Sequence, residues 1–147
     1  MMPRNKPWES YRKVATQTAS PGQLVLMLYD GAIGFSEKAL VGFSHSDPAL
    51  FNQTISNNVL RAQAIIHEMN ASLNMRDGGE VASNFRRLYN YLYRRLRDAN
   101  RSKKKEPIEE TIKHLRVLRE SWAEMLRNGG EARYLEEVQQ AQQAAAA

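Results

Sequence analysis

A run of apolar residues spaced for one face of a helix is the strongest constraint that the sequence places on the fold. The intervals are four, four, three, four, three and four positions, at Phe51, Ile55, Val59, Ala62, Ile66, Met69 and Leu73. This period matches an α-helix and not the two-residue alternation of a strand. Asp47-Pro48 is typical of a capped helix start, and turn-forming residues 74–79 end the run. Because only one face is apolar, this helix needs partners to cover it.

Two further segments carry the same kind of stripe. The first has its apolar residues at Val81, Phe85, Leu88, Leu92, Leu96 and Ala99. The second has them at Ile108, Ile112, Leu115, Leu118 (with Arg119 as the alternative), Trp122 and Met125 or Leu126. Pro107 fits the first turn of the second segment, and Asn128-Gly129-Gly130 is typical of a helix end. The sequence therefore predicts two more helices, separated by a polar connector.

Residues 18–35, TASPGQLVLMLYDGAIGF, admit two interpretations. Asp30-Gly31 between apolar runs is typical of a hairpin turn, whereas Ser20-Pro21 is typical of a helix start. A hairpin would be a lone two-stranded ribbon beside three helices, which is marginal in water. The segment is also rich in Leu, Met and Ala, which favour helices. We therefore expect a helix from Ser20-Pro21, with one face formed by Leu24, Leu28, Gly31, Phe35 and Ala39.

Two glycines inside this predicted helix need an explanation. Gly31 and Gly34 each cost roughly 1 kcal/mol relative to alanine in a helix interior. Their spacing places them side by side, where a neighbouring backbone can approach closely. We therefore predict close helix packing at both glycines, with a direct ligand contact as the alternative.

Four helices of similar length joined by short turns predict an all-α fold, an antiparallel four-helix bundle. The bundle is expected to occupy residues 1–130 as one domain, including a leader, residues 1–19. In the leader, Trp8, Tyr11 and Val14 are three apart, so it is either a frayed tail or a strip that docks on the bundle. Residues 131–147 form a low-complexity tail, which we expect to be a short C-terminal helix or disordered.

The sequence offers little chemistry for catalysis. It has no cysteine, which excludes disulfides, thiolate metal sites and thiol nucleophiles. Glu110 and His114 share a helix face, but no second pair completes a metal site, so a solvent-exposed pair is the simpler interpretation. Nucleotide-binding glycine motifs are absent as well. We therefore expect no enzyme activity, no cofactor and no metal.

The hydropathy pattern bears on location. No apolar run reaches the roughly 20 residues that span a bilayer, and residues 1–8 lack the apolar core of a secretory signal. We therefore expect a cytoplasmic protein without membrane insertion.

Basic residues are concentrated between positions 86 and 105 of a chain whose net charge is +5. Nine of them, opposed by Asp98 alone, lie there: Arg86, Arg87, Arg94, Arg95, Arg97, Arg101, Lys103, Lys104 and Lys105. A solvated helix face that ends in a basic loop is the simplest explanation. Because Tyr89, Tyr91 and Tyr93 alternate with these charges, an RNA- or DNA-binding bundle is the alternative.

Three longer segments carry a family resemblance. Residues 10–35, SYRKVATQTASPGQLVLMLYDGAIGF, combine a leader tyrosine, a Thr-Ala-Ser-Pro helix start and a Leu-Tyr-Asp-Gly-Ala sequence. Residues 73–100, LNMRDGGEVASNFRRLYNYLYRRLRDAN, contain Gly-Gly-Glu, Leu-Tyr-x-Tyr, Arg-Arg-Leu and Ala-Asn. Residues 115–125, LRVLRESWAEM, contain Leu-Arg-x-x-Trp. In this order the three resemble FliS, a family of flagellar export chaperones, with small departures at Gly22-Gln23 and Phe85.

The resemblance implies a four-helix bundle with a docked N-terminal segment and no enzymatic activity. It implies that the client is flagellin, whose disordered C-terminal segment is held on the chaperone's outer surface as helical and extended pieces. Holding that segment prevents premature polymerisation in the cytoplasm and presents flagellin to the flagellar type III export gate. Nucleic acid is not an expected partner under this interpretation.

The resemblance also implies client-binding residues. In the leader they are Tyr11, which we expect to contribute first, and its apolar neighbour Val14. In the first helix they are Leu24, Met27, Leu28, Tyr29 and Asp30, and in the third they are Asn84, Tyr89, Tyr91 and Arg94. Which of these form the core and which contact the client stays open. So does the partner of Asp30, which is the leader, a neighbouring helix or the client.

Overall fold

The computed structural model describes residues 20–146, and these fold into α-helices joined by short turns. The elements are α2 (Pro21–Gly42), α3 (Pro48–Ala71), α4 (Gly79–Ser102), α5 (Glu106–Met125), the π-helical turn η1 (Leu126–Gly130) and α6 (Glu131–Ala146). No strand occurs between residues 20 and 146, so the predicted all-α fold is confirmed. The predicted leader lies outside the described residues.

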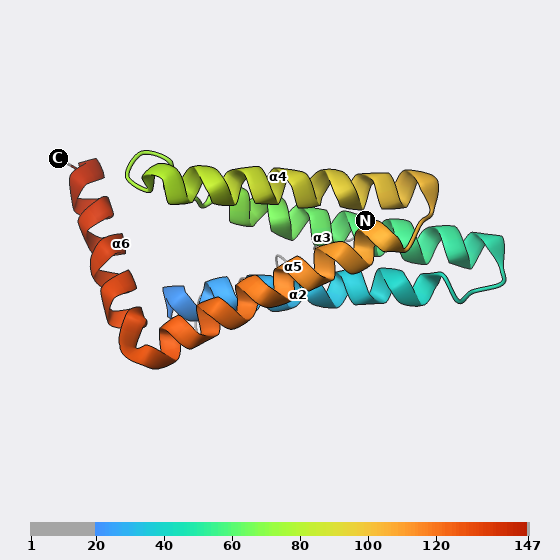
Figure 1. Ribbon diagram of the computed structural model, residues 1–147, viewed down its shortest axis with the longest axis horizontal. Helices are drawn as coiled ribbons and strands as arrows, with labels where there is room; N and C mark the ends of the chain where they lie inside the picture. The colour runs from blue at the N-terminus through green and yellow to red at the C-terminus, as the bar shows by residue number, and fades with distance from the viewer. Residues whose placement is uncertain (1–19, 147) are drawn as a thin grey trace, which may run out of the picture.

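Helices α2 to α5 form an antiparallel four-helix bundle (Figure 1). Each consecutive pair packs side by side, and α5 returns to pack against α2, which closes the bundle. After η1 the chain turns sharply, and α6 stands across the end of the bundle where α2 and α4 begin (Figure 1). The C-terminal helix that the sequence allowed is therefore present, and it lies across the end of the bundle rather than along its length.

The residues that were predicted to start helices do so through their side chains. Ser20 has extended backbone geometry, and its Oγ accepts a hydrogen bond from the Gln23 amide at 3.3 Å. Pro21 then occupies the first turn, where its missing N–H costs nothing. Asp47 caps α3 in the same way, since its Oδ1 accepts from the Ala49 amide at 3.0 Å. The hairpin interpretation of residues 18–35 is thereby excluded.

The core follows the predicted stripes on α3 and α5 more closely than those on α2 and α4. Fully buried residues of the stripes include Ile55, Val59, Leu92, Leu96, Ile108 and Leu115. The predicted stripe on α4 is wrong at its start, because Val81 is 65% exposed and the neighbouring Ala82 is buried instead.

The predicted face of α2 is also displaced. Leu28 and Phe35 are only half-buried, whereas the buried face is formed by Tyr29, Ala32, Ile33, Ser36 and Ala39. Ala32, Ser36 and Ala39 on this face are small, which suits a helix that lies between α3 and α5 and packs against both. Leu28 and Phe35 pack at the edges of the face.

The two glycines in the interior of α2 that needed an explanation, Gly31 and Gly34, differ in their surroundings. A Cβ at Gly31 would lie 3.0 Å from Cδ1 of Ile65 on α3, so the predicted close packing is confirmed there. At Gly34 a Cβ would meet nothing within 4 Å, so the prediction is wrong at that position. Helices α2 and α3 approach each other more closely at Gly42 than at Gly31. A Cβ at Gly42 would lie 2.9 Å from Ile55 Cγ1 and 3.1 Å from the Ile55 backbone nitrogen.

Alanine at these glycines should therefore act in opposite directions. Gly34→Ala is expected to raise the free energy of unfolding by about 1 kcal/mol, because it removes the helix penalty of glycine without a clash. Gly42→Ala is expected to lower it by about 1–2 kcal/mol, because the new methyl group displaces Ile55. Denaturant titrations followed by circular dichroism measure both values. A stabilised Gly42→Ala variant would contradict the packing described above.

Candidate functional site

An apolar cleft of about 510 Å³ opens at the end of the bundle where α6 stands. Five helices contribute to its walls. The lining residues are Val25, Leu28 and Tyr29 from α2; Met69, Ser72, Leu73 and Asn74 from the end of α3 and the following turn; Phe85 and Tyr89 from α4; Trp122 from α5; and Glu137, Val138, Ala141, Gln142 and Ala145 from α6.

Two tyrosines of this cleft are joined across the bundle. The hydroxyl groups of Tyr29 and Tyr89 hydrogen-bond to each other at 2.7 Å, although the residues are 60 positions apart in the sequence. Both side chains are buried, and burial is the main cause that raises the pKa of each hydroxyl. Both tyrosines therefore stay neutral at physiological pH and bring a pair of hydroxyl groups to the cleft. The Phe85 ring lies 5.8 Å from that of Tyr89 and extends the aromatic surface.

Trp122 fixes the end of α5 to the start of α2. Its Nε1 donates a hydrogen bond to the Gly22 carbonyl at 2.7 Å. That carbonyl belongs to the first turn of α2, close to the Ser20 cap. The indole is half-buried and borders the cleft, so one residue both joins two helices and supplies apolar surface.

Helix α6 forms the outer wall of the cleft. Val138, Ala141 and Ala145 are spaced by three and four residues, so they present one small apolar face. The direction of α6 is set by η1, where Asn128 leaves helical geometry and Gly129 has φ of 80°. Glycine suits this left-handed conformation because it has no Cβ. The small side chains leave open space between α6 and the bundle, rather than filling it.

The structure brings three of the predicted site residues to the cleft. These are Leu28, Tyr29 and Tyr89. Leu24 and Met27 lie half-buried on α2, outside the lining of the cleft. Tyr11 and Val14 lie outside the described residues, so their roles stay predictions.

The remaining predicted residues lie on other surfaces. Asp30 is exposed and binds Arg119 of α5 at 2.8 Å, which identifies a neighbouring helix as its partner. The Tyr91 hydroxyl donates to Glu110 of α5. Asn84 and Arg94 are exposed on α4, away from the cleft lining.

Several cleft residues belong to stripes whose periodicity predicts only that other helices cover them. Met69, Leu73, Phe85 and Trp122 all belong to the predicted stripes, and no feature of their spacing separates cleft from core. Nothing in the low-complexity tail indicated that α6 would complete the site. The cleft forms where an apolar stripe continues past the point at which its partner helices diverge. That point can be located only once the three-dimensional arrangement of the helices is known.

The pair Glu110 and His114 has a structural explanation. Glu110 accepts hydrogen bonds from Tyr91 and from Arg95 Nε, the latter at 3.1 Å, and its distance from His114 is 4.0 Å. The hydrogen bond from Tyr91 is the main cause that lowers the pKa of Glu110. Across residues 20–130 and 136–146, no group of three His, Cys, Asp or Glu residues is arranged to hold a metal ion. In the same range no helix combines the length and the hydropathy needed to cross a membrane.

Comparisons with known proteins agree with the resemblance noted from the sequence. Residues 4–129 match the family model described as flagellar protein FliS. The chain is 30% identical over 122 residues to the flagellar secretion chaperone FliS of Bacillus subtilis, covering 83% of this chain and 87% of that protein. It is 32% identical over 111 residues to the protein of that name from Salmonella typhimurium, covering 76% and 80%. The Campylobacter jejuni protein is 31% identical over 130 residues, covering 86% and 96%.

Proposed function

Because the chain belongs to the FliS family of flagellar secretion chaperones, which have no enzymatic role, we propose that its client is flagellin and that it binds the C-terminal segment of flagellin. Bound in this way, the segment is kept from polymerising in the cytoplasm and is delivered to the flagellar type III export apparatus. The proposal starts from the family membership, and the cleft is the surface on which the client segment would bind.

The apolar cleft is the observation that carries this proposal. The cleft has a volume of about 510 Å³ and is lined mainly by aliphatic and aromatic residues from five helices. An amphipathic segment binds such a surface by laying its apolar side chains into the groove while its polar face stays in water. The bundle thus hides the surface through which a client segment would otherwise associate with other copies.

A disordered client makes binding reversible. Ordering a flexible segment consumes several kcal/mol of the interaction free energy, so a large contact area yields only moderate affinity. Secretion requires that the client is released at the export apparatus, and an interface of moderate affinity allows this release. The cleft alone is too small to hold a whole segment, which agrees with a client bound as separate pieces.

We assign the predicted client contacts to three regions: the cleft and its extension along α2, the outside of the bundle, and the leader. Leu28, Tyr29 and Tyr89 would receive apolar side chains in the cleft, together with Val25 and Phe85. Leu24 and Met27 would extend this surface along α2. The exposed residues would hold other pieces of the client on the outside of the bundle; these residues are Asp30, Asn84, Tyr91 and Arg94. From the leader, Tyr11 and Val14 would add apolar contacts.

Removing the C-terminal segment of flagellin is expected to abolish complex formation. Full-length flagellin should bind the full chain measurably in isothermal titration calorimetry, and the truncated form should bind at least roughly 100-fold more weakly, because the segment carries the apolar contacts. Flagellin shortened by the same length at its N-terminus is the matched control and should bind normally. Equal binding of both truncated forms would exclude the C-terminal segment as the client region.

A further inference from the structure

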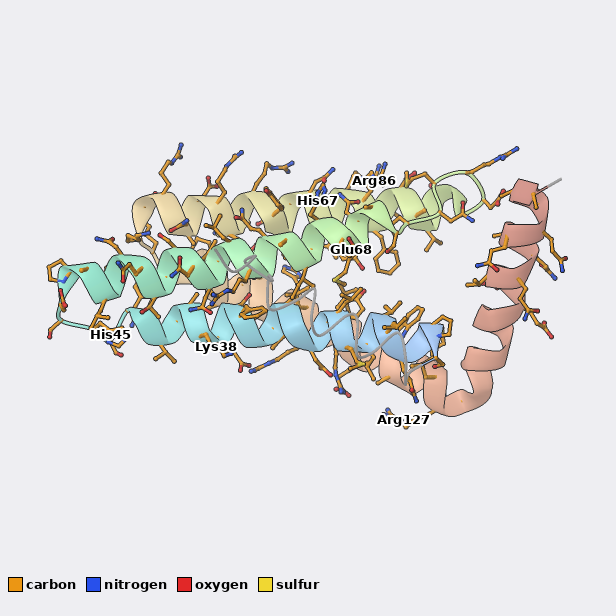
Figure 2. The ribbon with its side chains drawn as sticks, turned by 180° about the vertical axis from the view of Figure 1, so that it is seen from behind. Lys38, His45, His67, Glu68, Arg86 and Arg127 are labelled. Carbon is orange, nitrogen blue, oxygen red and sulfur yellow. The ribbon has the colours of Figure 1, made fainter. Side chains whose placement is uncertain are left out.

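Four arginines of the basic stretch 86–105 form a row along the outer side of α4. They are Arg87, Arg94, Arg97 and Arg101, which we call the arginine stripe. Their spacings of seven, three and four residues place them on one side of the helix. All four are exposed, whereas Leu92 and Leu96 on the opposite side are buried. In Figure 2, nitrogen-tipped side chains project from this outer edge of α4.

Other members of the basic stretch have partners within the chain. Arg86 donates from Nε to Oδ1 of Asn70 at 3.1 Å and so joins α4 to α3. Arg95 binds Glu110 at 3.1 Å and joins α4 to α5. These two arginines contribute to the bundle itself. Lys103 also donates to Ser56 of α3, whereas the contacts of Arg87, Arg97 and Arg101 stay within α4.

The stripe remains strongly positive. Asp98 lies 4.0 Å from Arg97 and 3.9 Å from Arg101, and those two arginine side chains are 61% and 79% exposed. Arg87 is bonded to the neutral amide of Asn84. Like charges three or four residues apart destabilise a helix, so the stripe lowers the stability of the free protein. Binding of a partner that neutralises these charges would explain why the stripe is present.

We propose that the arginine stripe binds an acidic helical segment of a partner protein. From Arg87 to Arg101 the stripe spans about 21 Å, because each helical residue rises about 1.5 Å. Carboxylates spaced by three and four residues on a second helix repeat at the same distance. Each guanidinium can bind a carboxylate through two parallel hydrogen bonds, which lysine cannot do. None of the stripe residues lines the cleft, so the partner can bind while the cleft holds a piece of the client. Arg94 is the one stripe residue that is also a proposed client contact.

The surroundings of the stripe favour protein over nucleic acid. Single strands are bound through a basic groove combined with aromatic rings on which bases stack. The nearest exposed tyrosines, Tyr91 and Tyr93, lie on the flanks of α4, and the Tyr91 hydroxyl is bonded to Glu110. The stripe itself follows the convex outer surface of one straight helix. Its charge pattern therefore matches a rod of carboxylates better than a flexible chain of bases.

A designed peptide tests this proposal without knowledge of the natural partner. The probe is an alanine-based helical peptide of about 21 residues with glutamates three and four positions apart on one face. Its binding to the full chain is measured by fluorescence anisotropy at low salt. The variant Arg94→Gln/Arg97→Gln/Arg101→Gln removes three charges from the stripe. The matched control, Lys38→Gln/Arg76→Gln/Lys113→Gln, removes three exposed charges elsewhere.

We expect the stripe variant to bind the peptide at least about tenfold more weakly, and the control variant to stay within about twofold of the original protein. A peptide with the same composition but glutamates distributed around the helix should also bind weakly. Equal losses in the two variants would show that only net charge matters and would overturn the proposal. So would failure of the peptide to bind at low salt. Tighter stripe-dependent binding of a DNA duplex or single strand would assign the stripe to nucleic acid instead.

Discussion

The variant Val25→Glu is expected to weaken flagellin binding by at least roughly 100-fold, because a carboxylate in an apolar cleft loses its hydration when the client docks. Val25 lines the cleft from the first turns of α2 and is only partly buried. In the free protein the cleft is open, so the glutamate stays in contact with water. The loss should therefore fall on binding rather than on the stability of the bundle.

The same substitution on a solvent face is the matched control. Val117 lies on α5 with 61% of its surface exposed and does not line the cleft. Val117→Glu should change client affinity by no more than about twofold, as is usual for exposed positions. Titration calorimetry with flagellin gives both affinities, and thermal melts show whether each variant is folded. Val25→Thr, which keeps the shape of valine, serves as a milder test with an expected loss of roughly tenfold. Equal effects at Val25 and Val117 would place the client elsewhere.

Local signals in the sequence predicted the helices well. The stripe from Phe51 to Met69 lies on α3, with Leu73 just beyond its end, and the paired Ser-Pro and Asp-Pro starts coincide with real caps. These signals act within one or two turns of chain, where helix geometry alone decides which side chain meets which backbone group. They also distinguished a helix from a hairpin at Asp30-Gly31, because the neighbouring residues favour the helical conformation.

Features that depend on distant residues could not be predicted in this way. The buried face of α2 includes Ala32, Ser36 and Ala39, whose small size matters only once α3 and α5 are in place. The hydroxyl contact between Tyr29 and Tyr89 and the ion pair between Asp30 and Arg119 join separate helices. Periodicity identifies which residues are apolar together. It does not show where helices diverge and turn a core face into a cleft.

Helix α6 is the part of the site that the sequence described least. Its glutamine and alanine content resembles a disordered tail, yet its apolar residues repeat on one face towards the cleft. Its main contacts are with η1 and α2, and none of its described residues belongs to the buried core of the bundle. We therefore expect α6 to contribute to client binding rather than to the stability of the bundle.

Deleting residues 129–147 is therefore expected to weaken client binding by roughly 10- to 100-fold, because the client loses the apolar contacts of Val138, Ala141 and Ala145. The melting temperature should fall by only a few degrees, since the bundle core is retained. Calorimetry with flagellin and thermal melts followed by circular dichroism test the two statements on the same protein samples.

A point substitution shows whether the effect of the deletion comes from the apolar face of α6 or merely from shortening the chain. Ala141→Glu places a carboxylate on the cleft face of α6, whereas Ala144→Glu places it on an exposed position outside the cleft lining. We expect the first to weaken binding by roughly tenfold and the second to leave it unchanged, because only the first must be desolvated when a client docks. Tighter binding after the deletion would reverse the assignment. It would show that α6 occupies the place of the client in the free protein and must move aside before flagellin can enter.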